Sequence, residues 1–156
     1  MNMILCADYM SSGEDALRDV HGEYADGYLI VQTLCNAGTV RIADRTYAMA
    51  YGGLGFIDGA ASYRISPDEP DDYLHSLTVI SRPVFHEMAA LLECTGTISE
   101  VFSGGGLYFP LDHPKTVEAR FKRMHSQFTA TSDISNAMLF CETLPLLNYA
   151  LYARAH

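Results

Sequence analysis

The order of apolar and polar positions divides the chain into two parts with different periods. Up to residue 81, short apolar runs alternate with turn residues, a pattern typical of strands in a β-sandwich or barrel. From residue 82 onward, apolar positions recur every three to four residues, which is typical of helices packed on one side. The sequence therefore predicts a mainly β first part and a helical second part within one domain.

The expected strands are apolar runs that end at glycine, asparagine, aspartate or proline, the residues that favour turns. One pair is expected to form a hairpin, because Ala43-Asp44-Arg45 can reverse the chain between two runs that alternate in polarity. The glycine pair at 52–53 and the glycines at 55 and 59 allow the sharp corners that small β-barrels need. The strands are predicted at residues 28–34, 40–42, 46–50, 54–58, 62–65 and 74–81.

Helices are expected near Pro83, over residues 114–129 and over residues 133–155, with Ser132 or Asp133 as N-cap of the last. This last helix carries two apolar stripes. One stripe can pack on its own domain, so the other predicts contact with an identical helix of a second copy. The stripe expected to form this homodimer seam comprises Phe140, Leu144, Leu147 and Leu151, and the other stripe comprises Ile134, Met138, Cys141 and Pro145.

Charge limits the partners that the domain can bind. The net charge is −9, and residues 1–111 carry fifteen acids against five bases, whereas residues 112–156 carry four acids against five bases. Such an acidic body does not attract nucleic acid by its own field, and neutral small molecules are easier partners. No apolar run is long enough to span a membrane, and the N-terminus lacks the basic region of a secretory signal, so a cytoplasmic location without membrane contact is expected.

Few residues suggest catalysis or a metal. The six histidines include no His-x-His, the four cysteines are widely spaced, and no G-x-S-x-G is present. We therefore predict no metal, no cofactor and no enzymatic activity. Ser62 has no neighbouring Asp-His pair in the sequence that would activate its hydroxyl as a nucleophile.

The strand and turn order resembles the cupin half of AraC/XylS-type transcriptional regulators. The similarity comprises the hairpin from Val40 to Ala50, the turn Gly53-Leu54-Gly55 and the aromatic strand from Tyr73 to Ile80. The helices at 114–129 and 133–155 are similar in order and apolarity to the dimerisation helices of that family. Ser62 stands where the family usually has a histidine, and tryptophan is absent.

The resemblance implies a cupin-like jelly-roll barrel over residues 1–81, followed by a connector and C-terminal dimerisation helices over residues 82–156 of the same domain. It further implies an effector-binding and homodimerising role. The effector would be a small molecule such as a sugar or a small organic acid. DNA would be bound only through a separate helix-turn-helix domain, for which these 156 residues have no room.

The expected effector contacts are polar side chains on strands that would line the barrel. His75 and Tyr63 can each bond a ligand hydroxyl or carbonyl, although either could instead be a satisfied interior group. Gln32 could equally face solvent. The full set of candidate contacts is His75, Tyr63, Gln32, Cys35 and Tyr73. Two alternatives remain open: a cupin-fold enzyme, such as a metal-dependent isomerase or dioxygenase, and an interaction domain with a filled barrel.

Overall fold

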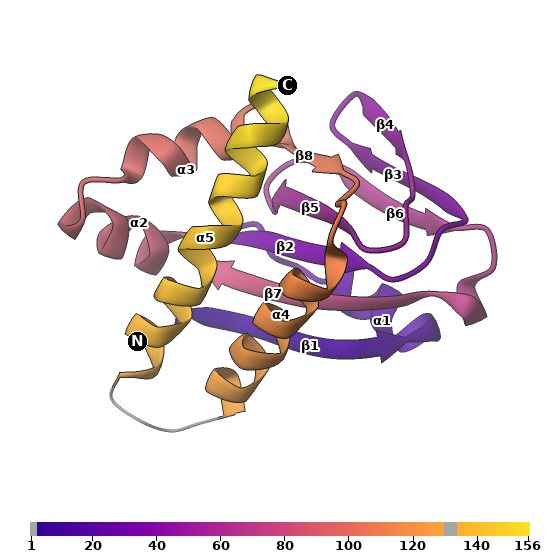
Figure 1. Ribbon diagram of the computed structural model, residues 1–156, viewed down its shortest axis with the longest axis horizontal. Helices are drawn as coiled ribbons and strands as arrows, with labels where there is room; N and C mark the ends of the chain where they lie inside the picture. The colour runs from indigo at the N-terminus through magenta and orange to yellow at the C-terminus, as the bar shows by residue number, and fades with distance from the viewer. Residues whose placement is uncertain (1–2, 130–133) are drawn as a thin grey trace.

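Two antiparallel β-sheets and five α-helices make up the part of the chain that the computed structural model describes, residues 3–129 and 134–156 (Figure 1). The larger sheet has the strand order β1-β7-β2-β5-β8, and the smaller has the order β4-β3-β6. The strands are β1 (Ile4–Ser12), β2 (Gly27–Thr33), β3 (Gly38–Ile42), β4 (Arg45–Ala48), β5 (Gly53–Asp58), β6 (Tyr63–Pro67), β7 (Leu74–Ser81) and β8 (Gly106–Phe109).

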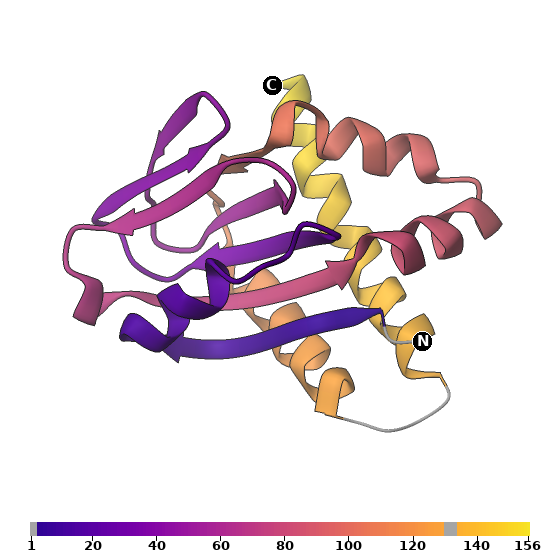
Figure 2. The same cartoon turned by 180° about the vertical axis from the view of Figure 1, so that it is seen from behind.

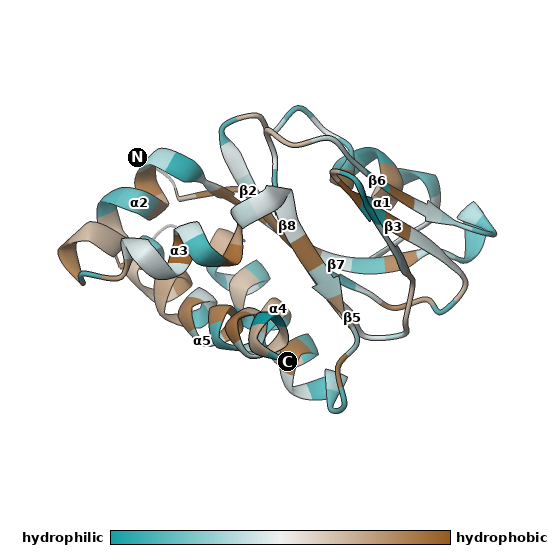
Figure 3. Cartoon of the chain, turned by 90° about the horizontal axis from the view of Figure 1, so that it is seen from above, coloured by the Kyte–Doolittle hydropathy of each residue, from teal (hydrophilic) through white to brown (hydrophobic). Residues whose placement is uncertain are grey.

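The helices α2 to α5 form a layer on one face of the larger sheet, and α1 and the smaller sheet lie on its other face (Figures 2 and 3). The chain therefore forms three layers, with the five-stranded sheet in the middle. The helices are α1 (Gly13–Val20), α2 (Arg82–Leu91), α3 (Thr95–Val101), α4 (Pro114–Thr129) and α5 (Ser135–Ala155).

Each face of the central sheet is covered by its own apolar cluster, because successive side chains of a strand point to opposite faces. Along β2, Tyr28 and Ile30 contribute to the cluster beneath the helices, whereas Leu29 and Val31 contribute to the cluster between the two sheets. Every residue of β2 is buried, as expected for a strand in the middle of a three-layer structure.

The start of the described chain lies against the first turn of the last helix, at one edge of the molecule (Figure 1). The strand β1 pairs with β7 along the sheet edge, and the backbone N–H of Met3 donates a 3.0 Å hydrogen bond to Oδ1 of Asn136 in α5. The first strand and the last helix are thus joined directly.

Glycine allows two close approaches around β5 and β8. A Cβ on Gly53 would lie 2.1 Å from the Tyr108 hydroxyl, so Tyr108 can cross this strand only because Gly53 lacks a side chain. Gly106 has φ of 125°, and a Cβ there would lie 1.8 Å from the carbonyl oxygen of Phe56. The glycines of this region therefore permit tight packing between neighbouring strands.

The structure confirms that antiparallel strands precede C-terminal helices, but it differs from the sequence expectation in three places. The strand β1 and the helix α1 occupy the first twenty residues, where no element was predicted, and α3 lies in the expected connector. No ladder joins the two sheets among the described strands, so they do not form a closed barrel, and a jelly-roll topology stays a prediction. The predicted N-caps Ser132 and Asp133 lie outside the described residues.

Candidate functional site

The space between the two sheets is apolar at one end and polar at the other. Strand β2 ends here with Thr33, which is paired in register with His75 of β7 and Gly53 of β5. Thr33 and His75 are both fully buried. Because buried polar groups need hydrogen-bond partners, the polar residues at this end form two clusters, each held together by hydrogen bonds.

The first polar cluster is built around His75, whose side chain has 0 % exposure. Its Nδ1 lies 2.9 Å from the Tyr73 hydroxyl, and its Nε2 lies 3.2 Å from Oδ2 of Asp8 in β1. The hydrogen bond from His75 lowers the pKa of Asp8 below its usual value. Burial and the nearby Asp8 carboxylate raise the pKa of Asp19 in α1. Strands β1 and β7 and helix α1 thus place two carboxylates beside one buried imidazole.

The second polar cluster is built around the Tyr108 hydroxyl, which crosses over Gly53. It accepts a 3.0 Å hydrogen bond from the backbone N–H of Ala50 and donates a 3.1 Å bond to the Ala50 carbonyl. Thr33 Oγ1 lies 2.5 Å from the same hydroxyl. These contacts fix the turn between β4 and β5, and they also keep the polar end of the interior packed.

A cavity of about 300 Å³ opens at this polar end of the sheets. The residues that line it include Cys35, Tyr51, Glu69 and Asp72. Tyr73 follows Asp72 directly in the chain and is fully buried. The cavity therefore lies next to the segment that carries the buried Tyr73–His75–Asp8 cluster.

The five predicted contact residues do not all share this region. His75 and Tyr73 lie at the polar end of the inter-sheet space, and Cys35 lines the cavity there. Gln32 faces the helices instead, where its Nε2 donates to the carbonyls of Gly52 and Pro114 at 3.3 and 3.0 Å.

Tyr63 lies elsewhere between the sheets. Its hydroxyl donates a 2.6 Å hydrogen bond to the carbonyl of Val20 at the end of α1, and its ring stacks on His21 with centroids 5.8 Å apart. Burial raises the pKa of Tyr63 to about 12. As a neutral phenol with a backbone partner, Tyr63 attaches α1 to the smaller sheet.

The residues of the expected dimer seam lie on the inner side of α5. Phe140 and Leu147 are only 2 % and 1 % exposed and belong to the cluster under the helices, and Leu144 and Leu151 pack partly against it. The other stripe faces outward. Its Ile134 and Met138 are 60 % and 41 % exposed, and Cys141 is exposed as well.

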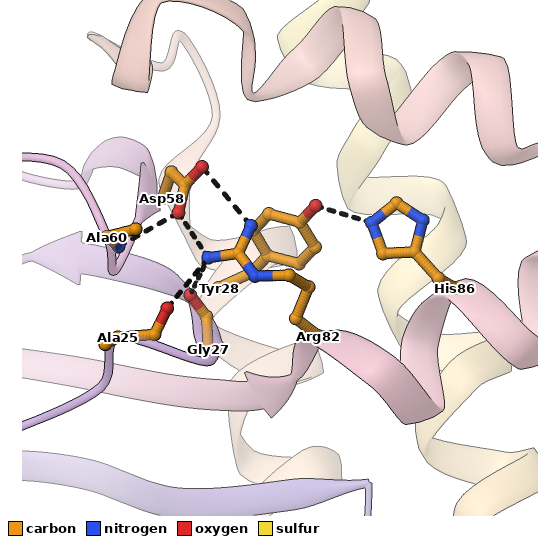
Figure 4. Close-up of polar contacts among 7 residues, drawn as sticks. All are labelled: Ala25, Gly27, Tyr28, Asp58, Ala60, Arg82 and His86. Atoms are coloured by element: carbon orange, nitrogen blue, oxygen red, sulfur yellow. Dashed lines mark hydrogen bonds and ion pairs between the residues drawn. The ribbon is translucent and has the colours of Figure 1, made fainter.

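A third cluster, which sequence reasoning missed, joins the central sheet to α2 (Figure 4). Both terminal nitrogens of Arg82, the first residue of α2, contact the carboxylate of Asp58 at the end of β5. The guanidinium lies 4.5 Å above the ring of Tyr28. The available signal was Asp58 itself, because a single acid inside a long apolar and aromatic stretch predicts a cationic partner.

The Arg82–Asp58 ion pair should make stability depend on pH. Burial alone would raise the pKa of Asp58, but the hydrogen bonds from Arg82 and the Ala60 N–H outweigh it and hold the pKa below its usual value. Asp58 therefore stabilises the fold above the pKa of the unfolded chain, about 4, and this contribution is lost as pH falls through the lower folded pKa. The free energies of unfolding of wild type and Asp58→Asn, measured in urea, should differ at pH 6 and become equal in acid. A difference that stays constant with pH would contradict the pairing.

Metal-binding groups and membrane-spanning helices are both absent from the described ranges, residues 3–129 and 134–156. These ranges contain no group of three or more His, Cys, Asp or Glu side chains placed to hold a metal ion. No helix in the same ranges combines the length and apolarity required to cross a bilayer.

Comparison with known proteins gives a likeness of fold. No protein-family model matches the sequence, and no curated protein matches it significantly. Among solved structures, the fold is similar to that of the AraC-like transcriptional activator CuxR, with a TM-score of 0.52 and 11 % sequence identity. The alignment covers 86 % of this chain but 46 % of that chain, so this chain spans less than half of the activator's length. At this identity the likeness concerns the fold alone.

Proposed function

We propose that this chain is the effector-binding and dimerising domain of an AraC-type transcriptional regulator, and that it is not an enzyme. The observation that carries the proposal is the likeness of fold to an AraC-like activator over 86 % of this chain. The matched part is 46 % of the activator, so more than half of that protein lies outside the part that resembles this chain. DNA would be bound by a separate helix-turn-helix domain, because the acidic body described here does not attract it.

The effector site of this proposal is the polar end of the inter-sheet space. The cavity beside Cys35 admits a molecule of modest size. Asp72 in its wall is followed directly by the buried Tyr73, whose hydroxyl lies 2.9 Å from Nδ1 of His75. These groups can donate to and accept from ligand hydroxyls once they exchange their present partners. The carboxylates of Glu69 and Asp72 at the rim favour an uncharged, hydroxyl-rich molecule such as a sugar over an organic acid.

Thermal-shift screening against neutral sugars and small aromatic acids tests the effector site. A ligand at about one hundred times its dissociation constant should stabilise the fold by about 2.7 kcal/mol. The variant Tyr73→Phe should reduce this shift because it removes the hydroxyl that is proposed to bind the ligand, whereas the matched variant Tyr63→Phe should keep it. A shift that depends on Tyr63 but not on Tyr73 would place the site elsewhere, and stoichiometric iron, manganese or nickel in the purified protein would favour the cupin-fold enzyme.

The second copy is proposed to bind along the outward stripe of α5. Ile134, Met138 and Cys141 lie one turn apart on that helix, and a cavity of about 360 Å³ separates them from α4. This surface belongs to the nearly neutral part of the sequence, so two copies can approach there without the repulsion of the acidic body. Leu144 and Leu151, on the same helix, are partly exposed as well.

Met138→Asp is expected to give a folded monomer. The charge would lie inside the proposed interface but on the surface of the subunit, so association should weaken at least tenfold while the unfolding midpoint changes little. Sedimentation velocity measures the change. Leu91→Asp is the matched control, since Leu91 is 81 % exposed on α2, away from this stripe. A dimer that survives Met138→Asp, or that Leu91→Asp dissociates, would contradict the proposed surface.

A further inference from the structure

We propose that α2 and α3 form one hinged unit, held to the central sheet by Arg82 and to α5 by Arg154, through which a change at the strand ends reaches the C-terminal helix. The two arginines act at opposite ends of the pair: Arg82 begins α2, and Arg154 contacts the end of α3. The physical coupling stands independently of any effector. Its use in signalling rests on the proposed function.

The ionic contact with the sheet is made at the first residue of α2. Besides the paired contacts with Asp58, Nη2 of Arg82 donates to the carbonyls of Ala25 and Gly27 at 3.1 and 3.5 Å. One side chain thus bonds the end of β5 and the segment leading into β2, while its own backbone continues from β7 (Figure 4). Charge-assisted bonds to a fixed carboxylate are the stronger kind, so Arg82 holds three strand ends together.

Aromatic side chains form the contact surface between this unit and the sheet. The ring of Tyr28 stacks on Phe102, at the end of α3, with centroids 4.0 Å apart. The Tyr28 hydroxyl lies 2.6 Å from Nε2 of His86, one turn after Arg82 in α2. Tyr28 therefore contacts both helices, and a shift of its strand moves the surface on which both helices rest.

Arg154 makes the hydrogen bonds that join α5 to the end of α3 in the described part of the chain. Its Nη2 donates to the carbonyls of Val101 and Ser103 at 2.8 and 2.7 Å, and to that of Gly106 at 3.3 Å. Phe85 of α2 adds an edge-to-face contact with Phe140 of α5, with centroids 5.2 Å apart. The far end of α5 thus follows the position of α3.

The inner faces of α2 and α3 are buried in the apolar cluster under the helices, whereas the turn between them lies outside it. Figure 1 shows α2 and α3 beyond the ends of the central strands, with the turn between them at the outer edge of the molecule. At that turn Leu91 and Leu92 are 81 % and 61 % exposed, and Glu93 has a positive φ of 56°. The strand β7 carries His75 at one end and runs directly into Arg82 at the other, so the polar end of the interior and the root of the hinge share one strand.

Hydrogen exchange with mass spectrometry on the whole chain tests this coupling without an effector. In Arg82→Gln, we expect amides of residues 82–101 to exchange at least about tenfold faster, while β3 and β4 keep their wild-type rates. Asp58→Asn should reproduce this pattern, because it removes the same ion pair from the sheet side. Arg18→Gln is the matched control, since Arg18 pairs with Asp15 on the exposed surface of α1.

Arg154→Gln should release the unit from its other end, with faster exchange in α3 and the last two turns of α5 and unchanged exchange in β2 and β7. Uniform acceleration across all strands in either variant would show a general loss of stability, and acceleration limited to the residues beside each arginine would show no joint movement. Both results overturn the coupling. Neither bears on effector binding, which the thermal-shift screen measures separately.

Discussion

Leu147→Asp is expected to unfold the subunit rather than to separate two intact copies. The Leu147 side chain is 1 % exposed and lies in the apolar cluster between α5 and the central sheet. A carboxylate there has no cationic partner prepared for it, so the substitution should cost about 4 kcal/mol or more. That is a large share of the 5–15 kcal/mol typical of a domain. Circular dichroism during urea unfolding should show a lost or strongly lowered midpoint.

Met138→Asp provides the matched comparison, because it introduces the same charge on the outward face of α5, where Met138 is 41 % exposed. The two variants should differ by several kcal/mol in unfolding free energy, and only Met138→Asp should remain soluble and folded. A folded monomer from Leu147→Asp would contradict the packing of α5 described above. It would instead support the seam that the sequence pattern predicts through Phe140, Leu144, Leu147 and Leu151.

Gly106→Ala is expected to destabilise the fold by roughly 3 kcal/mol or more, because it combines two costs. Its φ of 125° is strained for any residue with a side chain, and the new Cβ would lie 1.8 Å from the Phe56 carbonyl oxygen. Backbone rather than a flexible side chain occupies that space, so β8 would have to separate from β5. Thermal unfolding followed by circular dichroism measures the loss.

Gly96→Ala is the control for this substitution. Gly96 lies in α3, and nothing is within 4 Å of the position its Cβ would take. Alanine is the better helix former, so this variant should be stabilised by about 0.5–1 kcal/mol. Equal effects at the two positions would mean that the approach of β8 to β5 is not as close as described.

Periodicity predicted the elements whose two sides differ in polarity. The helix over residues 114–129 is an example, since Val117, Phe121 and Met124 are its buried residues and most of its other positions are polar. The strand β1 escaped prediction for a physical reason. Asp8 interrupts its apolar pattern, yet this acid faces the interior because its carboxylate lies 3.2 Å from Nε2 of His75. A pairing between residues 67 positions apart leaves no mark in the local sequence.

The sequence predicted which residue types form the candidate site, but only partly which face of its strand or helix each side chain occupies. Tyr73 precedes β7 and His75 lies on it, two positions further along, so the sequence places both side chains on the same side, and both are fully buried. Gln32 is on a strand that is buried on both faces, and its neighbours gave no means of choosing a face. The stripes of α5 had the same ambiguity. Both are apolar, and only the position of the central sheet shows that Phe140 faces inward and Met138 outward.

The hydrogen bond between Met3 and Asn136 spans 133 positions of the chain, and this separation has a consequence for folding kinetics. Pairing that joins such distant segments closes a very large loop, and domains rich in such contacts fold in milliseconds to seconds rather than microseconds. During synthesis, β1, β2 and β7 leave the ribosome well before α5. Their apolar face stays uncovered until that helix emerges, which makes the nascent chain a natural client for chaperones.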